Sequence, residues 1–563
     1  MRNYLHNLRS KRYAFAAILS GIMLGLAFPA PSFFLLGWIL PGALFIFCSQ
    51  KTSLNSSYQF QTSTPFQFGW LCGLSFWLFT LRWLLCIPFP SGAFMSWITL
   101  SSYLALYFAV WCWMIKKYTT NLPLLISSIF AASLWITLEW IRGFLFTGFA
   151  WNMLYVSQHE ISSLIWMSSI TGGYGISFLM VALSVSCWGG FIKFIRSSST
   201  VSYTVGNNKP FSLFVTIITS CKEAILLSII LILCICIGIN QNQKTLSKNR
   251  SDNTYKIAQI QPSIPQTLIW DSEANKEQFS HMIKETRSIL STNTIDLLIF
   301  PEAAIPGYIR YDHNIAQKLR QLAIDFNTPI LFCSDDAEPN KKNPSQTDFF
   351  NCAFLMDENG ILTARYIKRH LVMFGEYIPL ITYIPFLRHF SPISGNYTAG
   401  NENTSFPWPT KKQRSAPLIC FDDSFPEEVR HHVQNNVSVF ICLINAGWFM
   451  ESIAHWQHLA NTRFRSIENG IPSIRSCNNG ITCWIDDTGN IHDIFRDQNG
   501  SVYGKGYQII QFTIPNSAES GKNTFYNRHG PWFVYLSICL IISVTGNFYL
   551  LKYQQLRQYP RAN

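Results

Sequence analysis

The sequence predicts a polytopic helical membrane domain that carries an α/β domain, and three observations support this fold class. Apolar segments close to the ~20 residues that a helix needs to cross a bilayer recur through residues 1–240 and once more near the end of the chain. Residues 255–515 instead alternate short apolar runs of strand type with helical stretches. Only 13% of the 563 residues are charged, whereas 15% are aromatic, which is poor in charge for a soluble protein.

Eight apolar segments are predicted to be membrane-spanning helices. The first follows a basic N-terminus and could also be a cleaved signal peptide, since Ala27 and Ala30 are small residues near its end. Phe28 and Pro29 suit a cleavage site badly and more apolar segments follow at once, so a retained span is favoured. The predicted spans are 13–29, 32–48, 66–86, 93–114, 122–141, 171–192, 223–239 and 531–551.

The distribution of Lys and Arg predicts the orientation of these spans. Basic residues precede the first span, follow the second, fourth and sixth, and occupy the tail, whereas the loops after the first and third spans carry none. Because Lys and Arg are enriched in cytoplasmic loops, both termini are expected in the cytoplasm and residues 240–530 outside it. The formal charge of +12 comes from scattered residues beside apolar runs, which favours a membrane surface over nucleic acid as partner.

The polar middle of the chain is predicted to be a layered α/β sandwich. Helical stretches at 272–290, 314–326 and 454–469 alternate with apolar runs, and the turn at 487–490 predicts a hairpin. The apolar strand-like runs are 257–260, 297–300, 329–333, 352–356, 418–421, 437–444, 474–477, 481–485 and 509–514. The predicted organisation is therefore a seven-span membrane domain (1–240), a linker (241–254), the α/β domain (255–515), and a final span with a cytoplasmic tail (516–563).

Three residues lie at strand ends of the α/β domain, in the order Glu302, Lys368 and Cys420. Each has an ordinary interpretation: an acid at a helix N-terminus, a solvated loop lysine, and a small buried apolar residue. Together they supply a base, a cation and a thiol, which is the minimum for acyl transfer through a covalent intermediate. Cys420 opens onto an acidic turn, so its thiol is expected to be exposed. The 15 cysteines show no metal-ligand spacing, and no metal or other cofactor is expected.

The order and the local sequences of these three residues resemble the Glu-Lys-Cys triad of the nitrilase superfamily over roughly 255–515. With eight predicted spans, the chain resembles the apolipoprotein N-acyltransferase family, bacterial inner-membrane enzymes with a nitrilase-like αββα sandwich between the seventh and eighth spans. Beyond the triad, the resemblance rests on 264–266, 270–271, 368–372, 374–379, 463–468 and 478–480, and in the membrane part on 139–143 and 147–149.

The chain departs from the family pattern at a few positions that leave the triad intact. Phe421 stands where the family usually has Tyr, Asp422 where it has Glu, and Met373 where it has Pro. Residues 445–450 read Asn-Ala-Gly-Trp-Phe-Met, where the family has Asn-Asp-Ala-Trp-Phe-Gly.

The resemblance implies a transfer in two steps. Glu302 takes the proton of Cys420, whose thiolate attacks the ester of a phospholipid acyl chain, while Lys368 and the backbone N–H of Phe421 hold the oxyanion. The α-amine of an S-diacylglyceryl cysteine, at the N-terminus of an apolipoprotein, then attacks the thioester.

Further residues are assigned supporting roles by the same resemblance. Glu376 and Asp422 would orient the catalytic lysine, although Glu376 could also be a surface carboxylate. Trp270, Tyr397 and Trp448 would form a lid over the acyl chains, and anchoring at the membrane interface is the alternative for these aromatic side chains.

Three other functions remain to be weighed. A membrane-tethered amidase of nitrilase type would use the same triad, with water resolving the thioester. A transporter is disfavoured because the spans offer few buried charges and no paired broken helices, and a catalytically dead scaffold is disfavoured by the intact triad. An oxidising compartment would permit disulfides among Cys333, Cys352, Cys442, Cys477 and Cys483.

Overall fold

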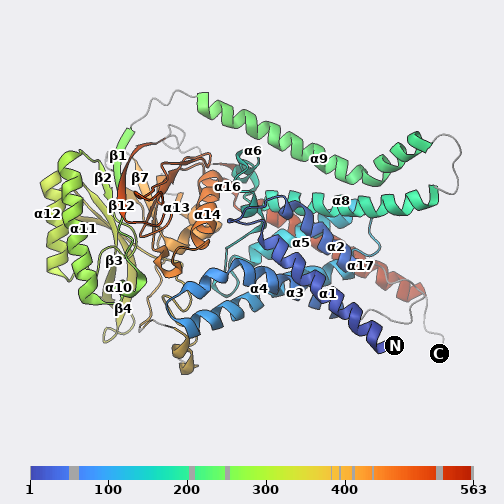
Figure 1. Cartoon of the computed structure of the whole chain (residues 1–563), viewed down its shortest axis with the longest axis horizontal. Helices are drawn as coiled ribbons and strands as arrows, with labels where there is room; N and C mark the ends of the chain where they lie inside the picture. The colour runs from blue at the N-terminus through green and yellow to red at the C-terminus, as the bar shows by residue number, and fades with distance from the viewer. Residues whose placement is uncertain are drawn as a thin grey trace. The chain divides into compact units, whose positions relative to one another are not determined.

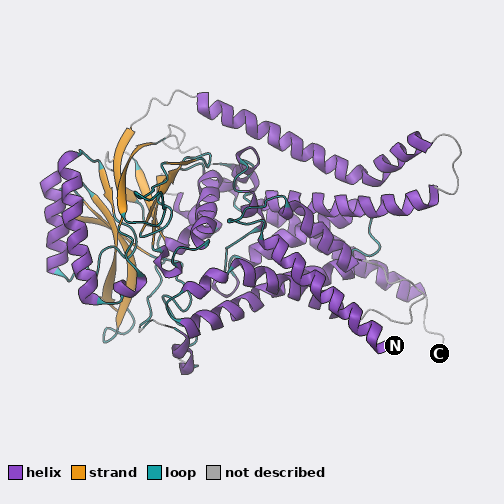
Figure 2. Cartoon of the chain, viewed as in Figure 1, coloured by secondary structure: helices purple, strands orange, loops and turns teal. Residues whose placement is uncertain are grey.

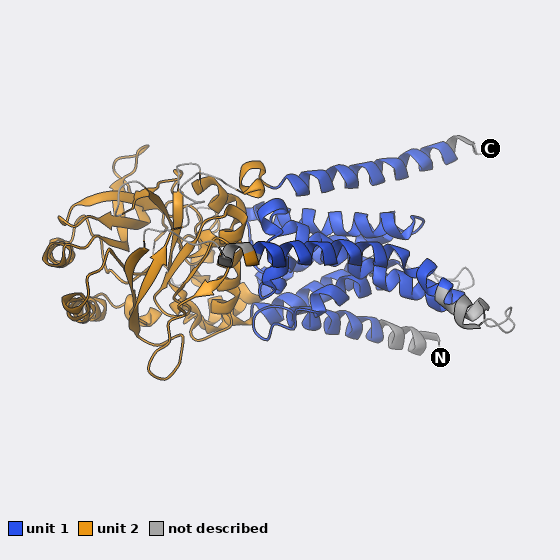
Figure 3. Cartoon of the chain, turned by 90° about the horizontal axis from the view of Figure 1, so that it is seen from above, with its two compact units in different colours: residues 1–81, 98–242, 531–563 blue, residues 82–97, 243–530 orange. Residues whose placement is uncertain are grey.

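The chain divides into two compact units (Figure 3), each described here by itself. Unit 1 comprises residues 1–81, 98–242 and 531–563, and unit 2 comprises residues 82–97 and 243–530. The computed structural model describes residues 2–49, 63–201, 209–247, 254–381, 383–391, 393, 395–408, 413–433, 437–514 and 524–558.

Unit 1 is helical, and a helix coincides with each of the eight predicted spans. Among the described residues, α4, α5, α8, α9 and α17 are long and apolar enough to cross a membrane by length and composition, while α2 is a shorter apolar helix. The figure of eight spans therefore stays a prediction. The helices are α1 (Arg2–Gly25), α2 (Leu36–Ser49), α3 (Ser63–Thr80), α4 (Pro90–Tyr118), α5 (Leu124–Arg142), α8 (Tyr174–Val201), α9 (Lys209–Ser247) and α17 (Trp532–Gln558).

Glycine allows close helix packing in unit 1. A Cβ on Gly21 of α1 would lie 2.1 Å from the carbonyl oxygen of Cys72 on α3, so only glycine permits this approach.

Between α5 and α8 the chain forms short helices rather than a simple turn: η2 (Leu145–Thr147), η3 (Leu154–Gln158), α6 (Ser162–Ile165) and α7 (Ser168–Thr171). Arg142 donates to the carbonyl oxygens of Phe149 and Trp151, at 3.0 and 2.7 Å, and so holds the start of this connection against α5.

The third predicted span is helical only as far as Thr80. Residues Arg82–Cys86 form the short 3-10 helix η1 instead and belong to unit 2. There the Trp83 indole N–H donates to Gln457 Oε1 at 3.1 Å, and its ring meets Phe449 edge-on at a centroid distance of 4.4 Å.

Unit 2 contains two six-stranded sheets, with orders β12-β1-β2-β3-β4-β5 and β11-β10-β9-β8-β7-β6. Strands β1, β2 and β3 run parallel, as do β7, β8 and β9. The strands are β1 (Thr254–Gln261), β2 (Leu297–Ile299), β3 (Ile330–Pro339), β4 (Thr347–Met356), β5 (Leu362–Ile367), β6 (Phe406–Pro407), β7 (Arg414–Ile419), β8 (Val437–Ile444), β9 (Ser473–Cys477), β10 (Cys483–Ile485), β11 (Ile491–His492) and β12 (Gly506–Thr513). The strands and helices of unit 2 are coloured separately in Figure 2.

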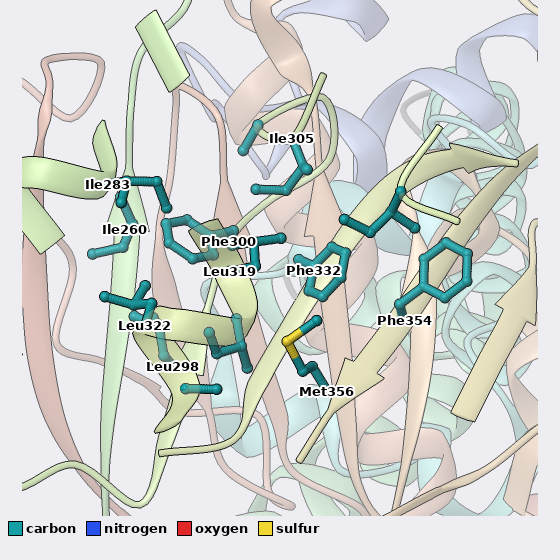
Figure 4. Packing of buried hydrophobic residues seen from close by; sticks show 14 of the residues in the cluster. Ile260, Ile283, Leu298, Phe300, Ile305, Leu319, Leu322, Phe332, Phe354 and Met356 are labelled. Carbon is teal, nitrogen blue, oxygen red and sulfur yellow. The ribbon is translucent and has the colours of Figure 1, made fainter. Parts of the chain in front are cut away.

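Helices cover the outer face of each sheet, which gives the predicted αββα layering. The first sheet packs against α11 and α12 through a cluster that includes Leu298, Phe332 and Leu319 (Figure 4). A second cluster, with Ile257 and Ile441, lies between the sheets, and a third packs α13 on the second sheet. The helices of unit 2 are α10 (Gln266–Ile269), α11 (Ser272–Thr292), α12 (His313–Phe326), α13 (Pro426–His432), α14 (Ala454–Asn469) and α16 (Phe525–His529), with 3-10 helices η4 (Pro385–Phe390), η5 (Cys420–Ser424) and η7 (Ala446–Phe449). Figure 1 labels most of these elements.

Side-chain caps mark the starts of α11 and α12. Asp271 and Asp312 precede α11 and α12, and each carboxylate accepts hydrogen bonds from two backbone N–H groups of the first turn.

The hairpin predicted at 487–490 joins β10 to β11, where Gly489 has φ +87°. The predicted strand 418–421, however, ends at Ile419, because Cys420 has a left-handed backbone that cannot continue a strand.

Candidate active site

The residues of the predicted triad follow three different strands that end close together. Glu302 comes shortly after β2, Lys368 directly after β5, and Cys420 directly after β7. The charges of Glu302 and Lys368 both act on the Cys420 thiol. The structure therefore brings together three residues that are far apart in the sequence.

Lys368 is buried between two carboxylates. Only 1% of the residue is exposed, and its Nζ lies 2.8 Å from Glu376 Oε1 and 3.3 Å from Glu302 Oε1. Burial lowers the pKa of Lys368, but Glu302 and Glu376 outweigh it and raise that pKa well above its usual value. The lysine is thus a fixed cation. The ordinary interpretations of a solvated loop lysine and of Glu376 as a surface carboxylate are both wrong.

Glu302 is held by donors on both carboxylate oxygens. The backbone N–H of Asn445 donates to Oε2 at 2.8 Å, and the Asn351 side-chain amide donates to Oε1 at 2.8 Å. Asn351 also donates to Glu376 Oε1 at 3.0 Å, so one amide aligns both carboxylates around the lysine. Sequence reasoning missed Asn351. The signal that could have found it is its position as a polar residue in the middle of strand β4.

Cys420 starts the 3-10 helix η5 with φ +49°. The residue is half-buried and packs against two apolar clusters, so the prediction of an exposed thiol on an acidic turn is wrong. Asp422 and Asp423 behind it are also buried. Burial raises the pKa of the Cys420 thiol, Glu302 adds to the rise and Lys368 opposes it, so the resting thiol is protonated and needs a base.

Asp422 binds the chain on both sides of Lys368. Its carboxylate accepts from the Tyr366 hydroxyl at 2.9 Å, from the His370 backbone N–H at 3.0 Å and from the Ile419 backbone N–H at 3.1 Å. These bonds tie the segment that carries Lys368 to the end of β7. Asp422, which is predicted to orient Lys368, therefore binds residues on either side of the lysine, namely Tyr366 and His370.

The pKa of Asp422 predicts a pH-dependent stability. Burial raises this pKa from 3.8 to about 7, so the folded protein binds a proton that the unfolded chain releases at lower pH. The contribution of the protonated carboxyl is fully present below the unfolded value and is lost as the pH rises through about 7. Asn does not titrate, so wild type should lose stability relative to Asp422→Asn between pH 5 and pH 8. Thermal unfolding at both pH values measures this difference, and a wild-type advantage that grows with pH would contradict it.

Two of the three proposed lid residues meet. The rings of Trp270 and Trp448 are edge to face with centroids 5.4 Å apart, and 44% of Trp270 is exposed. Tyr397 lies elsewhere in the site: its hydroxyl donates to Asp335 Oδ1 at 2.8 Å, and its backbone N–H donates to the carbonyl oxygen of Glu376. The lid function of these aromatic residues stays a prediction.

Two further residues complete the site. The ring of Phe421, the residue after Cys420, packs edge to face against Phe425 with centroids 4.9 Å apart. Asp335, which sequence reasoning missed, faces the carboxylate cluster, and burial raises its pKa to about 6.

Comparisons with known proteins match both parts of the chain. A family model described as carbon-nitrogen hydrolase matches residues 256–508, and one described as apolipoprotein N-acyltransferase N-terminal domain matches residues 20–186. An amidase structure from Nesterenkonia sp. AN1 covers 49% of this chain and 97% of its own, at 18% identity and a TM-score of 0.34.

The αββα sandwich that holds Glu302, Lys368 and Cys420 coincides with the match to the carbon-nitrogen hydrolase family model, which defines the fold class of this unit. The relatives extend over both units. The apolipoprotein N-acyltransferase of Geobacter metallireducens is 30% identical over 93% of this chain and 92% of its own length. That of Rickettsia prowazekii is 28% identical over 94% of this chain and 96% of its own. The chain belongs to the apolipoprotein N-acyltransferase family and is a membrane acyltransferase.

Proposed function

We propose that this acyltransferase moves one acyl chain from a phospholipid to an apolipoprotein through a thioester on Cys420. The acceptor is the α-amine of the N-terminal S-diacylglyceryl cysteine. The observation that carries the proposal is the buried cluster of Glu302, Lys368 and Glu376 beside the half-buried thiol of Cys420. A phospholipid donor fits a catalytic unit whose chain continues into apolar helices, since the donor then reaches it from the bilayer.

The first half-reaction forms the acyl-enzyme. Glu302 accepts the proton of Cys420 Sγ, and the thiolate adds to the carbonyl carbon of the phospholipid ester. The ammonium of Lys368 and the backbone N–H of Phe421 stabilise the oxyanion. The C–O bond then breaks, Glu302 returns the proton to the departing alkoxide, and a lysophospholipid leaves.

The second half-reaction restores the thiol. The lipoprotein α-amine adds to the thioester carbonyl while Glu302 takes a proton from its nitrogen. The C–S bond breaks, an amide forms, and the proton passes to Cys420 Sγ. Glu376 holds Lys368 in place through both steps, and Trp270 and Trp448 cover the acyl chain. A membrane-tethered amidase, in which water takes the place of the amine, is not favoured by the relatives.

The proposed setting is the bacterial inner membrane, with the catalytic domain (255–515) in the periplasm. The membrane domain (1–240), the linker (241–254) and the final segment (516–563) complete the organisation, with both termini in the cytoplasm. No diffusible cofactor is required by either half-reaction.

The orientation predicts the labelling of an engineered cysteine in α11. A membrane-impermeant maleimide should label Lys276→Cys, whose native side chain is half-exposed, in cells with a permeable outer membrane and an intact inner membrane. The charge distribution also predicts labelling of a cysteine placed in the linker near Asn253. That position lies outside the described residues. Labelling of Lys276→Cys only after the inner membrane is opened would contradict a periplasmic catalytic domain.

Mass spectrometry of the acceptor tests the proposed function. A diacylglyceryl lipopeptide incubated with the enzyme and a phospholipid of defined chains should gain the mass of one acyl chain on its N-terminal amine. Release of free fatty acid with an unmodified lipopeptide would instead indicate the amidase-like reaction with water.

A further inference from the structure

One face of α14 contacts the turn that carries the nucleophile. His458, Thr462 and Arg465 follow one another on this face at helical spacing. Thr462 Oγ1 donates to Asp423 Oδ2 at 2.6 Å, and Arg465 reaches the carbonyl oxygen of Ser424 at 3.4 Å. The helix therefore holds the turn at several points behind the catalytic thiol.

His458 makes the contact nearest to the nucleophile. Its Nε2 lies 2.5 Å from Asp423 Oδ1, and its ring also hydrogen-bonds the backbone of Cys420. His458 and Asp423 are both buried. One imidazole thus connects the backbone of the nucleophile to a carboxylate of the same turn.

Asp423 is a buried charge with a full set of partners. Besides His458 and Thr462, it faces Arg475 of β9, whose guanidinium lies 3.3 Å from Oδ2. Burial raises the pKa of Asp423, but the hydrogen bonds from His458 and Thr462 and the charge of Arg475 outweigh it and lower that pKa. The carboxylate is therefore ionised and gives His458 a fixed anchor.

The backbone of Cys420 needs such an anchor. A residue other than glycine adopts a left-handed backbone at an energetic cost, and it keeps that conformation only where its surroundings impose it. We infer that Asp423 and His458 form a positioning pair that fixes the left-handed backbone of Cys420, and with it the direction of the thiol and of the Phe421 N–H. This inference rests on the proposed role of Cys420 as nucleophile.

Three variants test the pair: His458→Gln, Asp423→Asn and the double variant. Each single change should lower kcat at least ~10-fold, with the KM for phospholipid within ~2-fold, because orientation of reacting groups affects kcat. The double variant should lose no more than the worse single variant, because residues that act as one unit are not additive. Losses that multiply, or a His458→Gln enzyme with normal kcat at a temperature where it is folded, would overturn the inference.

Alkylation of Cys420 by iodoacetamide supplies a readout that needs no lipid. If the pair is lost, the thiol moves away from Lys368, so the pH profile of alkylation should shift upward by roughly one unit. A profile that stays at the wild-type position in both folded single variants would also overturn the inference. Wild-type protein that alkylates normally but never carries an acyl group would instead refute the nucleophile role.

The matched control is His492→Gln. His492 also pairs with an aspartate, with Nε2 3.2 Å from Asp486 Oδ2, at the β10–β11 hairpin. Loss of this pair should leave kcat and the alkylation profile of Cys420 unchanged. An equal effect in the control would show that any lost His–Asp pair disturbs the site, and would overturn a specific role for His458.

Discussion

Cys420→Ala should abolish acyl transfer, with phospholipid and lipopeptide both present. The variant lacks the thiol that is proposed to carry the acyl chain, so neither half-reaction can proceed. Cys420→Ser should be nearly as inactive, because Glu302 is a weak base for an alcohol whose pKa lies far above that of a thiol. Transfer is measured by the appearance of the triacylated lipopeptide with time.

The control for this prediction is Cys236→Ala, which removes an exposed thiol of α9 and should leave the rate unchanged. Glu302→Gln should fail in the same way as Cys420→Ala, because the thiol then keeps its proton. Substantial transfer by Cys420→Ala would mean that another nucleophile or a direct transfer operates.

Lys368→Met should reduce kcat by about 10²- to 10³-fold, which corresponds to roughly 3–4 kcal/mol of lost oxyanion stabilisation. The change also leaves Glu302 and Glu376 without the cation that separates them. Removal of one partner from a buried ion pair costs about 3–5 kcal/mol of stability, so the melting temperature must be measured beside the rate.

A surface lysine provides the control for this effect. Lys505 also binds a glutamate, with Nζ 2.7 Å from Glu285 Oε1, but it is half-exposed. Lys505→Met should therefore change neither kcat nor folding. Near-normal turnover of a folded Lys368→Met enzyme would show that the lysine does not stabilise the oxyanion.

Glu302, Lys368 and Cys420 could be proposed as a triad from the sequence because each lies at or shortly after the end of a strand. Both sheets contain parallel and antiparallel pairs. In the first sheet β2 and β5 run in the same direction, so Glu302 and Lys368, which follow them, lie at one edge of that sheet. The same local sequence pattern does not predict which residues hydrogen-bond to the triad. Asn351 lies in the middle of β4 and aligns two carboxylates, a role that depends on a strand pairing which the sequence does not reveal.

The acidic turn shows why burial could not be predicted. Two adjacent aspartates after a strand are typical of solvent-exposed turns, yet Asp422 and Asp423 are buried. Most of their partners, among them Tyr366 and Arg475, lie far away in the sequence. The local sequence carries no signal for these remote donors.

Peptide mapping of the acyl-enzyme tests the central claim most directly. Wild-type protein incubated with phospholipid alone should carry one acyl chain on the peptide that contains Cys420. Neutral hydroxylamine should release this chain, and so should the diacylglyceryl lipopeptide, to which the same chain should then be attached. An acyl group on any other residue, or lipopeptide acylation without a loaded Cys420 intermediate, would contradict transfer through this thioester.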